Sequence, residues 1–264
     1  MSLRGWRLRP VLVEFGPFQI HAYTVCMLTA VLVGGWLTYR EAQRRVRLTD
    51  ETLMIGSMGL VGGGVGAKLS MVVFLGPAEF WRQLATIPAH GAALTGALIG
   101  GYLAVVLTER VLKVERCTGD LVAPFLPLGQ AIGRLGNFLA GDAYGSVTTL
   151  PWGVYQAGAY RHPAALYEMV LDLALFAFLW RRRYTSFRDG ELFRMYVVGY
   201  ALIRFPLEFL RYQPTPRAFL DLTLVQWLSI AAVLGFGYQL YLQRKGVACV
   251  CDLLPRFRRK ESVA

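Results

Sequence analysis

The segment GRLGNFLAGDAYG, residues 133–145, follows an apolar stretch and carries a single arginine, Arg134. Leaving an arginine in hydrocarbon costs roughly 3 kcal/mol on insertion scales. The glycines around it let the backbone or a ligand approach closely. Arg134 should therefore either tie a broken helix to a carboxylate or carbonyl, or bind an anionic headgroup, because a planar guanidinium suits phosphate. The segment predicts a site for negative charge at membrane depth.

The composition is typical of a polytopic membrane protein. Apolar residues make up 55% of the 264 residues and charged residues only 17%. The net charge of +11 is explained by cytoplasmic loops, which collect Lys and Arg. No basic stripe with interleaved aromatics indicates nucleic-acid binding. The N-terminal residues lack the apolar core and cleavage site of a signal peptide, so we expect the spans to direct insertion.

Seven stretches are candidate membrane spans, since crossing the hydrocarbon takes about 20 apolar residues. They cover approximately 18–38, 52–75, 92–108, 121–140, 164–180, 192–210 and 222–242. The fourth contains Pro124 and Pro127, so we expect it to be kinked or broken. No internal repeat and no long linker is visible. The sequence therefore predicts an all-α integral-membrane protein with one domain over residues 1–264.

Loop charges predict the orientation. Arg and Lys gather after the first, third and fifth spans and after the last one, in residues 40–47, 110–116, 181–194 and 244–260. The intervening loops carry fewer basic residues. The positive-inside rule places the richer set in the cytoplasm, with the N-terminus outside and the C-terminus inside. The polar segment 141–163 then lies on the outer side.

Other polar residues within the spans admit two interpretations each. Arg204 and Glu208 lie four apart, so they form either a plain helical ion pair or a pair in which Glu208 orients Arg204 towards a substrate. Lys68 follows a glycine run and either snorkels to the interface or contacts a ligand. Tyr23 is either an interfacial aromatic or a hydrogen-bond donor. The four cysteines are Cys26, Cys117, Cys249 and Cys251. Their spacing is that of neither a metal site nor a disulfide framework.

Several motifs together resemble the prolipoprotein diacylglyceryl transferase family. The most specific is Gly133-Arg134-Leu135-Gly136-Asn137-Phe138. It is joined, in the family's order and over nearly the whole chain, by weaker motifs: His21-Ala22-Tyr23, Gly66-Ala67-Lys68-Leu69, His162-Pro163 with Tyr167-Glu168, and Arg204-Phe205-Pro206-Leu207-Glu208 with Arg211.

The resemblance implies a seven-span enzyme of the bacterial cytoplasmic membrane whose active site faces outward. It would move a diacylglyceryl group from phosphatidylglycerol to the lipobox cysteine thiol of a prolipoprotein, releasing glycerol phosphate, with no metal or cofactor. The implied catalytic residues are Arg134, Arg204, Tyr23, Tyr200 and Asp142. The implied substrate-binding residues are Arg134, Asn137, Gly145, Glu208, Arg211, Lys68 and His162.

The chain departs from the family pattern at three positions. Thr95 stands where the family often has a histidine implicated in catalysis, and Ala140 and Asp142 replace an Asn-x-Glu pair. Threonine is no general base at neutral pH, so His90, five residues earlier, is a candidate to replace the histidine. The alternative function is a divergent paralogue that binds anionic phospholipid but has another acceptor or little transfer activity. A transporter would predict inverted repeats, which are not seen.

Overall fold

The computed structural model describes residues 11–15, 18–45, 49–75, 91–114, 118–185, 188–212 and 219–246. These residues are mostly helical. The helices are α1 (Ala22–Arg44), α2 (Asp50–Leu75), α4 (Gly91–Val111), α5 (Gly119–Val122), α6 (Leu126–Ala140), α7 (Ala164–Arg182), α8 (Glu191–Leu210) and α9 (Leu224–Arg244), with a short 3-10 turn at Phe219–Asp221. The strands are β1 (Val11–Phe15), β2 (Phe18–His21), β3 (Val154–Gln156) and β4 (Ala159–Arg161).

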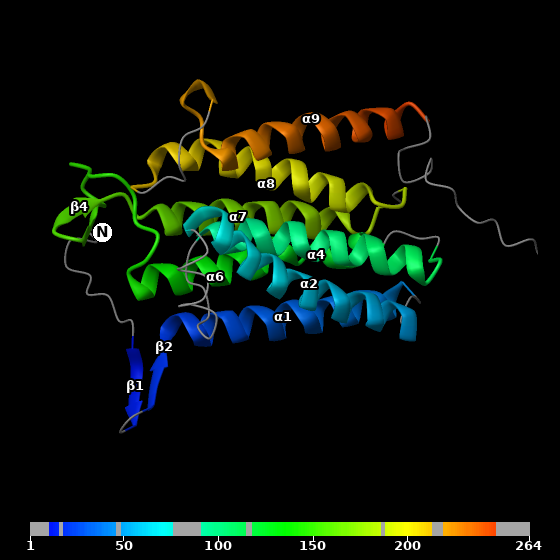
Figure 1. Ribbon diagram of the computed structural model, residues 1–264, viewed down its shortest axis with the longest axis horizontal. Helices are drawn as coiled ribbons and strands as arrows, with labels where there is room; N and C mark the ends of the chain where they lie inside the picture. Colours follow the sequence, from blue (N-terminus) through cyan, green and yellow to red (C-terminus); the bar gives the residue numbers. More distant parts are fainter. Residues whose placement is uncertain are drawn as a thin grey trace, which may run out of the picture.

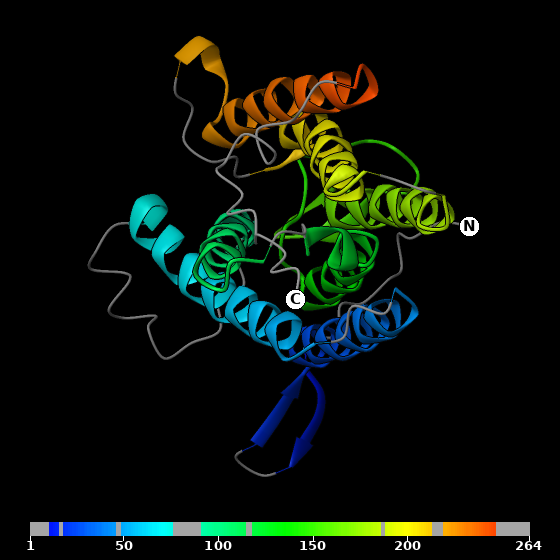
Figure 2. The same ribbon diagram turned by 90° about the vertical axis from the view of Figure 1, so that its right-hand side faces the viewer.

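The long helices lie side by side in an elongated bundle (Figure 1). The β1–β2 and β3–β4 hairpins lie at the same end of it, on the left of Figure 1. Seen end-on, α6, α7 and α8 are neighbours, α9 lies beyond α8, and the α2–α4 pair flanks them (Figure 2). The helices α6, α7 and α8 carry the polar residues described below.

Three described helical segments are long and apolar enough to cross a membrane, namely Ala22–Arg44, Asp50–Ser70 and Leu224–Arg244. The membrane character expected from composition is therefore confirmed. Seven spans and the orientation of the termini stay predictions. The ends of α1 and α7, both predicted to be cytoplasmic, do meet: buried Glu41 pairs with Arg44 and Arg45, and Arg183 lies 3.7 Å from Glu41.

Two short hairpins accompany the helices, and the first corrects the predicted start of the first span. Residues 18–21, assigned to the first span, form β2 and pair antiparallel with β1, whose Val11, Val13 and Phe15 are residue types that favour strands. The outer segment 141–163 contains the β3–β4 hairpin. Its two connecting residues, Ala157 and Gly158, have φ of 49° and 81°, the left-handed geometry that closes two-residue hairpins.

The break expected in the fourth span is confirmed. α5 ends at Val122 before Pro124, and α6 begins at Leu126 with Pro127 in its first turn, where a missing N–H costs nothing. Buried Asp120 of α5 accepts hydrogen bonds from the backbone N–H groups of Gly190 (2.6 Å) and Phe193 (2.9 Å). It therefore supplies the N-terminal acceptors that α8 requires.

The α2–α4 pair is joined through glycine. A Cβ added at Gly66 would lie 2.2 Å from the carbonyl oxygen of Gly96, and one at Gly100 would lie 2.4 Å from that of Gly62. No side chain fits between the two backbones, which is the usual basis of close helix packing in membranes. The glycine run before Lys68 thus serves helix–helix contact.

Candidate active site

A buried ion-pair cluster joins α6, α7 and α8. The Nη2 atom of Arg134 on α6 donates a hydrogen bond of 2.7 Å to Oε1 of Glu168 on α7. The other carboxylate oxygen of Glu168 lies 3.8 Å from Nη1 of Arg204 on α8. Arg204 in turn donates through Nη2 to Glu208 at 2.8 Å. We call these four residues the arginine–carboxylate cluster.

All four members of the cluster are buried, with exposed fractions of 3–4%. Buried ion pairs persist only where the geometry is good, because desolvation of each ion is costly. Two guanidinium atoms nevertheless lack a hydrogen-bond partner among the described residues, Nε of Arg134 and Nη1 of Arg204. The cluster thus keeps unused charged donors, from which an anion could accept hydrogen bonds.

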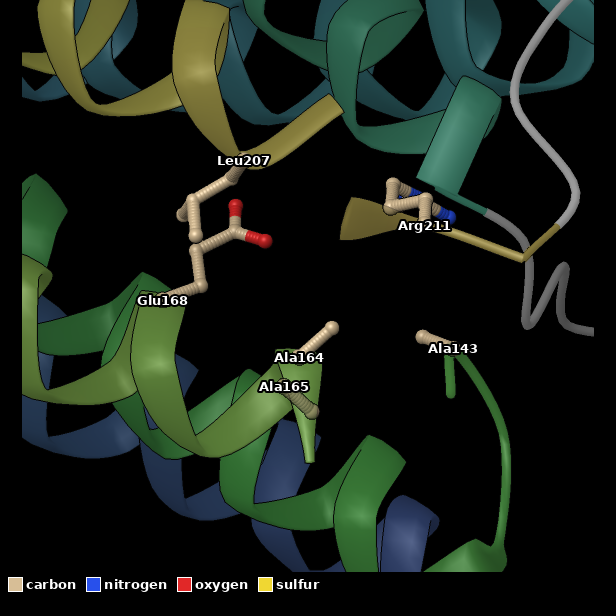
Figure 3. A pocket seen from close by; sticks show the side chains of 6 residues that line it. All are labelled: Ala143, Ala164, Ala165, Glu168, Leu207 and Arg211. Atoms are coloured by element: carbon tan, nitrogen blue, oxygen red, sulfur yellow. The ribbon is translucent and has the colours of Figure 1, made fainter. Parts of the chain in front are cut away.

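A pocket opens against this cluster (Figure 3). The carboxylate of Glu168 and the side chain of Arg211 enter it from different elements, and its other walls include the small side chains of Ala143 and Ala164. Burial and repulsion from the charges of Arg204 and Arg134 lower the pKa of Arg211 to about 10. A bound anion would relieve that repulsion. The pocket is therefore suited to negative charge.

Gly136 brings Tyr23 to the cluster. A Cβ at Gly136 would lie 2.9 Å from Cβ of Cys26 and 3.3 Å from Cα of Tyr23, so α1 and α6 pack closely at this point. The charges of Arg134 and Asp142 both act on the half-buried Tyr23 hydroxyl. Asn137 is buried one residue further along α6.

The end of α6 directs the chain into the outer loop. Gly141 has a left-handed φ of 83°, and the N–H of Asp142 bonds to the carbonyl of Asn137 at 2.9 Å, which is a Schellman-type end. The side chain of Asp142 is exposed. The α6 terminus therefore presents Asn137 inward and Asp142 outward.

Gly145 joins this loop to α8 and to His162. Its N–H donates to the carbonyl of His162 at 2.9 Å, and Ser146 donates to the carbonyl of Leu210 at 2.8 Å. A Cβ on Gly145 would lie 2.7 Å from Cβ and from O of His162 and 2.9 Å from the oxygen of Leu210. Any side chain there would push the loop away from α8 and the adjacent Arg211.

Three further predicted site residues, Tyr200, His162 and Lys68, lie outside the arginine–carboxylate cluster. Tyr200 on α8 stacks on Tyr196 and is acted on by the charges of Glu168, Arg204 and Arg134. Nδ1 of His162 lies 3.3 Å from the hydroxyl oxygen of Tyr167. Lys68 is half-buried on α2, which packs against α4 and not within the α6–α8 group.

Sequence reasoning missed Glu168 as the centre of the cluster, and Asp172 one helical turn further on. Both carboxylates are buried on the same apolar helix. Two acidic residues four apart in a predicted span were the available signal. It also missed Arg161, which is buried and stacks on Tyr212 at 3.9 Å.

One departure from the family pattern, at the side chain of Thr95, and its candidate replacement His90 lie outside the described parts. Their predicted roles therefore stay untested. Within the described ranges, no group of three His, Cys, Asp or Glu residues could hold a metal ion. Cys26 is a free, half-buried thiol.

Comparison with known proteins agrees with the motifs. The family model for prolipoprotein diacylglyceryl transferase matches residues 10–242. A phosphatidylglycerol–prolipoprotein diacylglyceryl transferase of Rhodospirillum rubrum is 36% identical over 248 residues, covering 86% of this chain and 89% of the relative. One of Trichormus variabilis is 37% identical, covering 76% and 78%, and one of Bordetella bronchiseptica is 33% identical, covering 90% and 97%. With Arg134, Arg204 and Glu208 of its motifs gathered in one buried cluster, this chain belongs to the prolipoprotein diacylglyceryl transferase family.

Proposed function

We propose that this protein transfers the diacylglyceryl group of phosphatidylglycerol to the cysteine thiol of a prolipoprotein lipobox. The relatives' names state that reaction. The observation that carries the proposal is the pair of unused guanidinium donors, Nε of Arg134 and Nη1 of Arg204, in a cluster whose Glu168 lines a pocket together with Arg211. Phosphatidylglycerol brings one negatively charged phosphodiester, whose oxygens can accept hydrogen bonds from these donors.

The chemical step is a displacement at the carbon of the diacylglyceryl group that is bonded to the phosphate oxygen. The substrate thiol attacks as a thiolate, and the proton it loses is balanced by the departing glycerol phosphate, whose new phosphate oxygen can take it up. The C–S bond forms as the C–O bond to phosphate breaks, and glycerol phosphate leaves with the bonding electron pair. Negative charge therefore moves onto the phosphate in the transition state. Arg134 and Arg204, already fixed by Glu168 and Glu208, are aimed to stabilise it without reorganisation.

The other residues have supporting roles in this proposal. Tyr23, Tyr200 and Asn137 donate hydrogen bonds to the headgroup, and Asp142 faces the entry from the outer side. Arg211 attracts the phosphate at the mouth of the pocket. Gly145 and His162 hold the loop beside it, and Lys68 contacts the lipid from α2.

The proposed setting is the bacterial cytoplasmic membrane. We assign seven spans, the N-terminus outside and the C-terminus in the cytoplasm, and an active site open to the outer side. The support is the distribution of Lys and Arg among the loops. Both β-hairpins and the loop of Gly145 lie at the end of the bundle that this assignment makes external (Figure 1).

The test is an assay of the purified protein with phosphatidylglycerol vesicles and a synthetic lipobox peptide. We expect glycerol phosphate release and a peptide mass increase by one diacylglyceryl group, both lost in Arg134→Ala. The matched control is Arg40→Ala, an exposed arginine on α1, which should keep the wild-type rate. Retention of lipid binding without peptide modification in the wild type would instead favour the divergent paralogue.

A further inference from the structure

Asp172 is a buried acid with no partner. It lies on α7 one turn beyond Glu168, and its exposed fraction is 0%. Neither carboxyl oxygen has a hydrogen-bond partner among the described residues. Buried carboxylates are normally paired or strongly hydrogen-bonded, because an isolated charge in a low-dielectric interior is costly. The transfer chemistry proposed above assigns Asp172 no role.

The arginine–carboxylate cluster is already balanced without Asp172. Arg134 and Arg204 carry two positive charges, and Glu168 and Glu208 carry two negative ones. A third carboxylate would therefore add a negative charge to a neutral buried cluster, and the further cation, Arg211, lines the pocket beside Glu168. The titratable and charged groups that face Asp172 come from its own helix and from both helices packed against it, and they are Glu168 on α7, Arg134 on α6, and Arg204, Tyr196 and Tyr200 on α8.

Gln130 on α6 also keeps a buried polar atom without a partner in the described part of the chain. Gln130 on α6 donates through its amide nitrogen to the hydroxyl of Tyr196 at 2.9 Å. The amide oxygen of Gln130 is buried and has no donor among the described residues. A neutral carboxyl offers one O–H donor, which a carboxylate lacks. Besides the free donors of Arg134 and Arg204, the buried groups without partners in the described ranges thus include the acceptors of Asp172 and Gln130, and a proton on Asp172 would add a donor.

We propose that Asp172 holds a proton in the working enzyme and thereby positions the guanidinium groups of Arg134 and Arg204. While it is neutral, Glu168 is the inner carboxylate for both arginines, and Nε of Arg134 and Nη1 of Arg204 stay available to the substrate's phosphate. When it ionises, it competes for these same donors from one turn deeper and draws them from the pocket. Asp172 is a positioning residue, and its role rests on the proposed transferase function.

The test compares pH profiles of kcat/KM. The active form has Asp172 protonated, so the wild-type rate should fall at alkaline pH, by about tenfold per pH unit past the midpoint. Asp172→Asn is neutral at every pH and should keep its rate through that range, with near wild-type activity below it. Asp172→Glu should still lose activity at alkaline pH, but the midpoint of that loss should lie at a different pH. Asp221→Asn, the same change at an exposed aspartate, should leave the profile unaltered.

Two results would overturn the proposal. One is an alkaline limb in Asp172→Asn with the wild-type midpoint. The other is a uniform loss at all pH values in a folded Asp172→Asn protein, which is what a purely structural role predicts. Infrared spectroscopy of the wild type covers the case in which Asp172→Asn does not fold. A protonated-carboxyl band at neutral pH that changes frequency in Asp172→Glu supports the proposal, and its absence contradicts it. The band is measured without substrate, so it decides the question even if the wild type transfers no lipid.

Discussion

The α6–α8 group and the α2–α4 pair solve the same packing problem in a membrane by different means. Lipid is as apolar as a leucine side chain, so helices there associate through close backbone contact or through polar groups. The α2–α4 pair uses glycine and leaves no space for a Cβ at Gly66 or Gly100. The α6–α8 group uses buried ion pairs around Glu168. Only the second arrangement leaves charged donors unused. The α6–α8 group is therefore suited to chemistry, whereas the α2–α4 pair serves as a scaffold.

The largest expected effect comes from a substitution in the α6–α8 group. Arg134→Ala should lower the transfer rate at least a hundredfold, which is the effect expected when one preorganised transition-state donor is lost. It should also destabilise the protein by about 3–5 kcal/mol, because Arg204 is left as the single guanidinium between the buried carboxylates of Glu168 and Glu208. Activity assays and thermal unfolding in detergent measure the two effects.

The double variant Arg134→Ala/Glu168→Gln separates stability from catalysis. Removing both charges should recover much of the lost stability while transfer stays absent. A double variant that regains transfer would show that the ion pair is purely structural, and the contrast between the two regions would fail.

The next effect in size concerns the glycine pair. Gly66→Ala should cost about 1–3 kcal/mol, as overpacking does, since the added Cβ would meet a backbone oxygen that cannot move independently. The transfer rate per folded molecule should not change. Gly64→Ala is the matched control, because nothing lies within 4 Å of its added Cβ. Equal unfolding temperatures for the two variants would refute the packing argument.

A smaller effect is expected at the mouth of the pocket. Arg211→Ala should raise the KM for phosphatidylglycerol about tenfold, the size expected for one charge-assisted contact, with kcat little changed. Stability should not fall, since the substitution removes a charge that Arg204 and Arg134 repel. A drop in kcat at unchanged KM would mean that Arg211 acts in the transition state and not in binding.

Sequence reasoning reached the helices and the arginines more readily than their partners. Long apolar runs and Pro124 predicted the spans and the break before α6, because hydropathy and proline act locally. Arg134 and Arg204 were found because an arginine in hydrocarbon is costly. Glu168 was missed, since its role depends on two helices that meet only in the folded bundle.

The hairpins were missed for a different reason. The first candidate span was begun at residue 18 by its apolar content, although residues 18–21 alternate between apolar and polar as a strand does, and they pair with 11–15. Short apolar runs do not distinguish strand from helix, and pairing between β1 and β2 decides the outcome.

A structure of the protein bound to phosphatidylglycerol is the most direct test of whether the arginine–carboxylate cluster is the lipid site. We predict that the phosphate oxygens lie within hydrogen-bond distance of Nε of Arg134 and Nη1 of Arg204, with Arg211 at the rim. A phosphate bound elsewhere, with both atoms still unpartnered, would contradict the assignment.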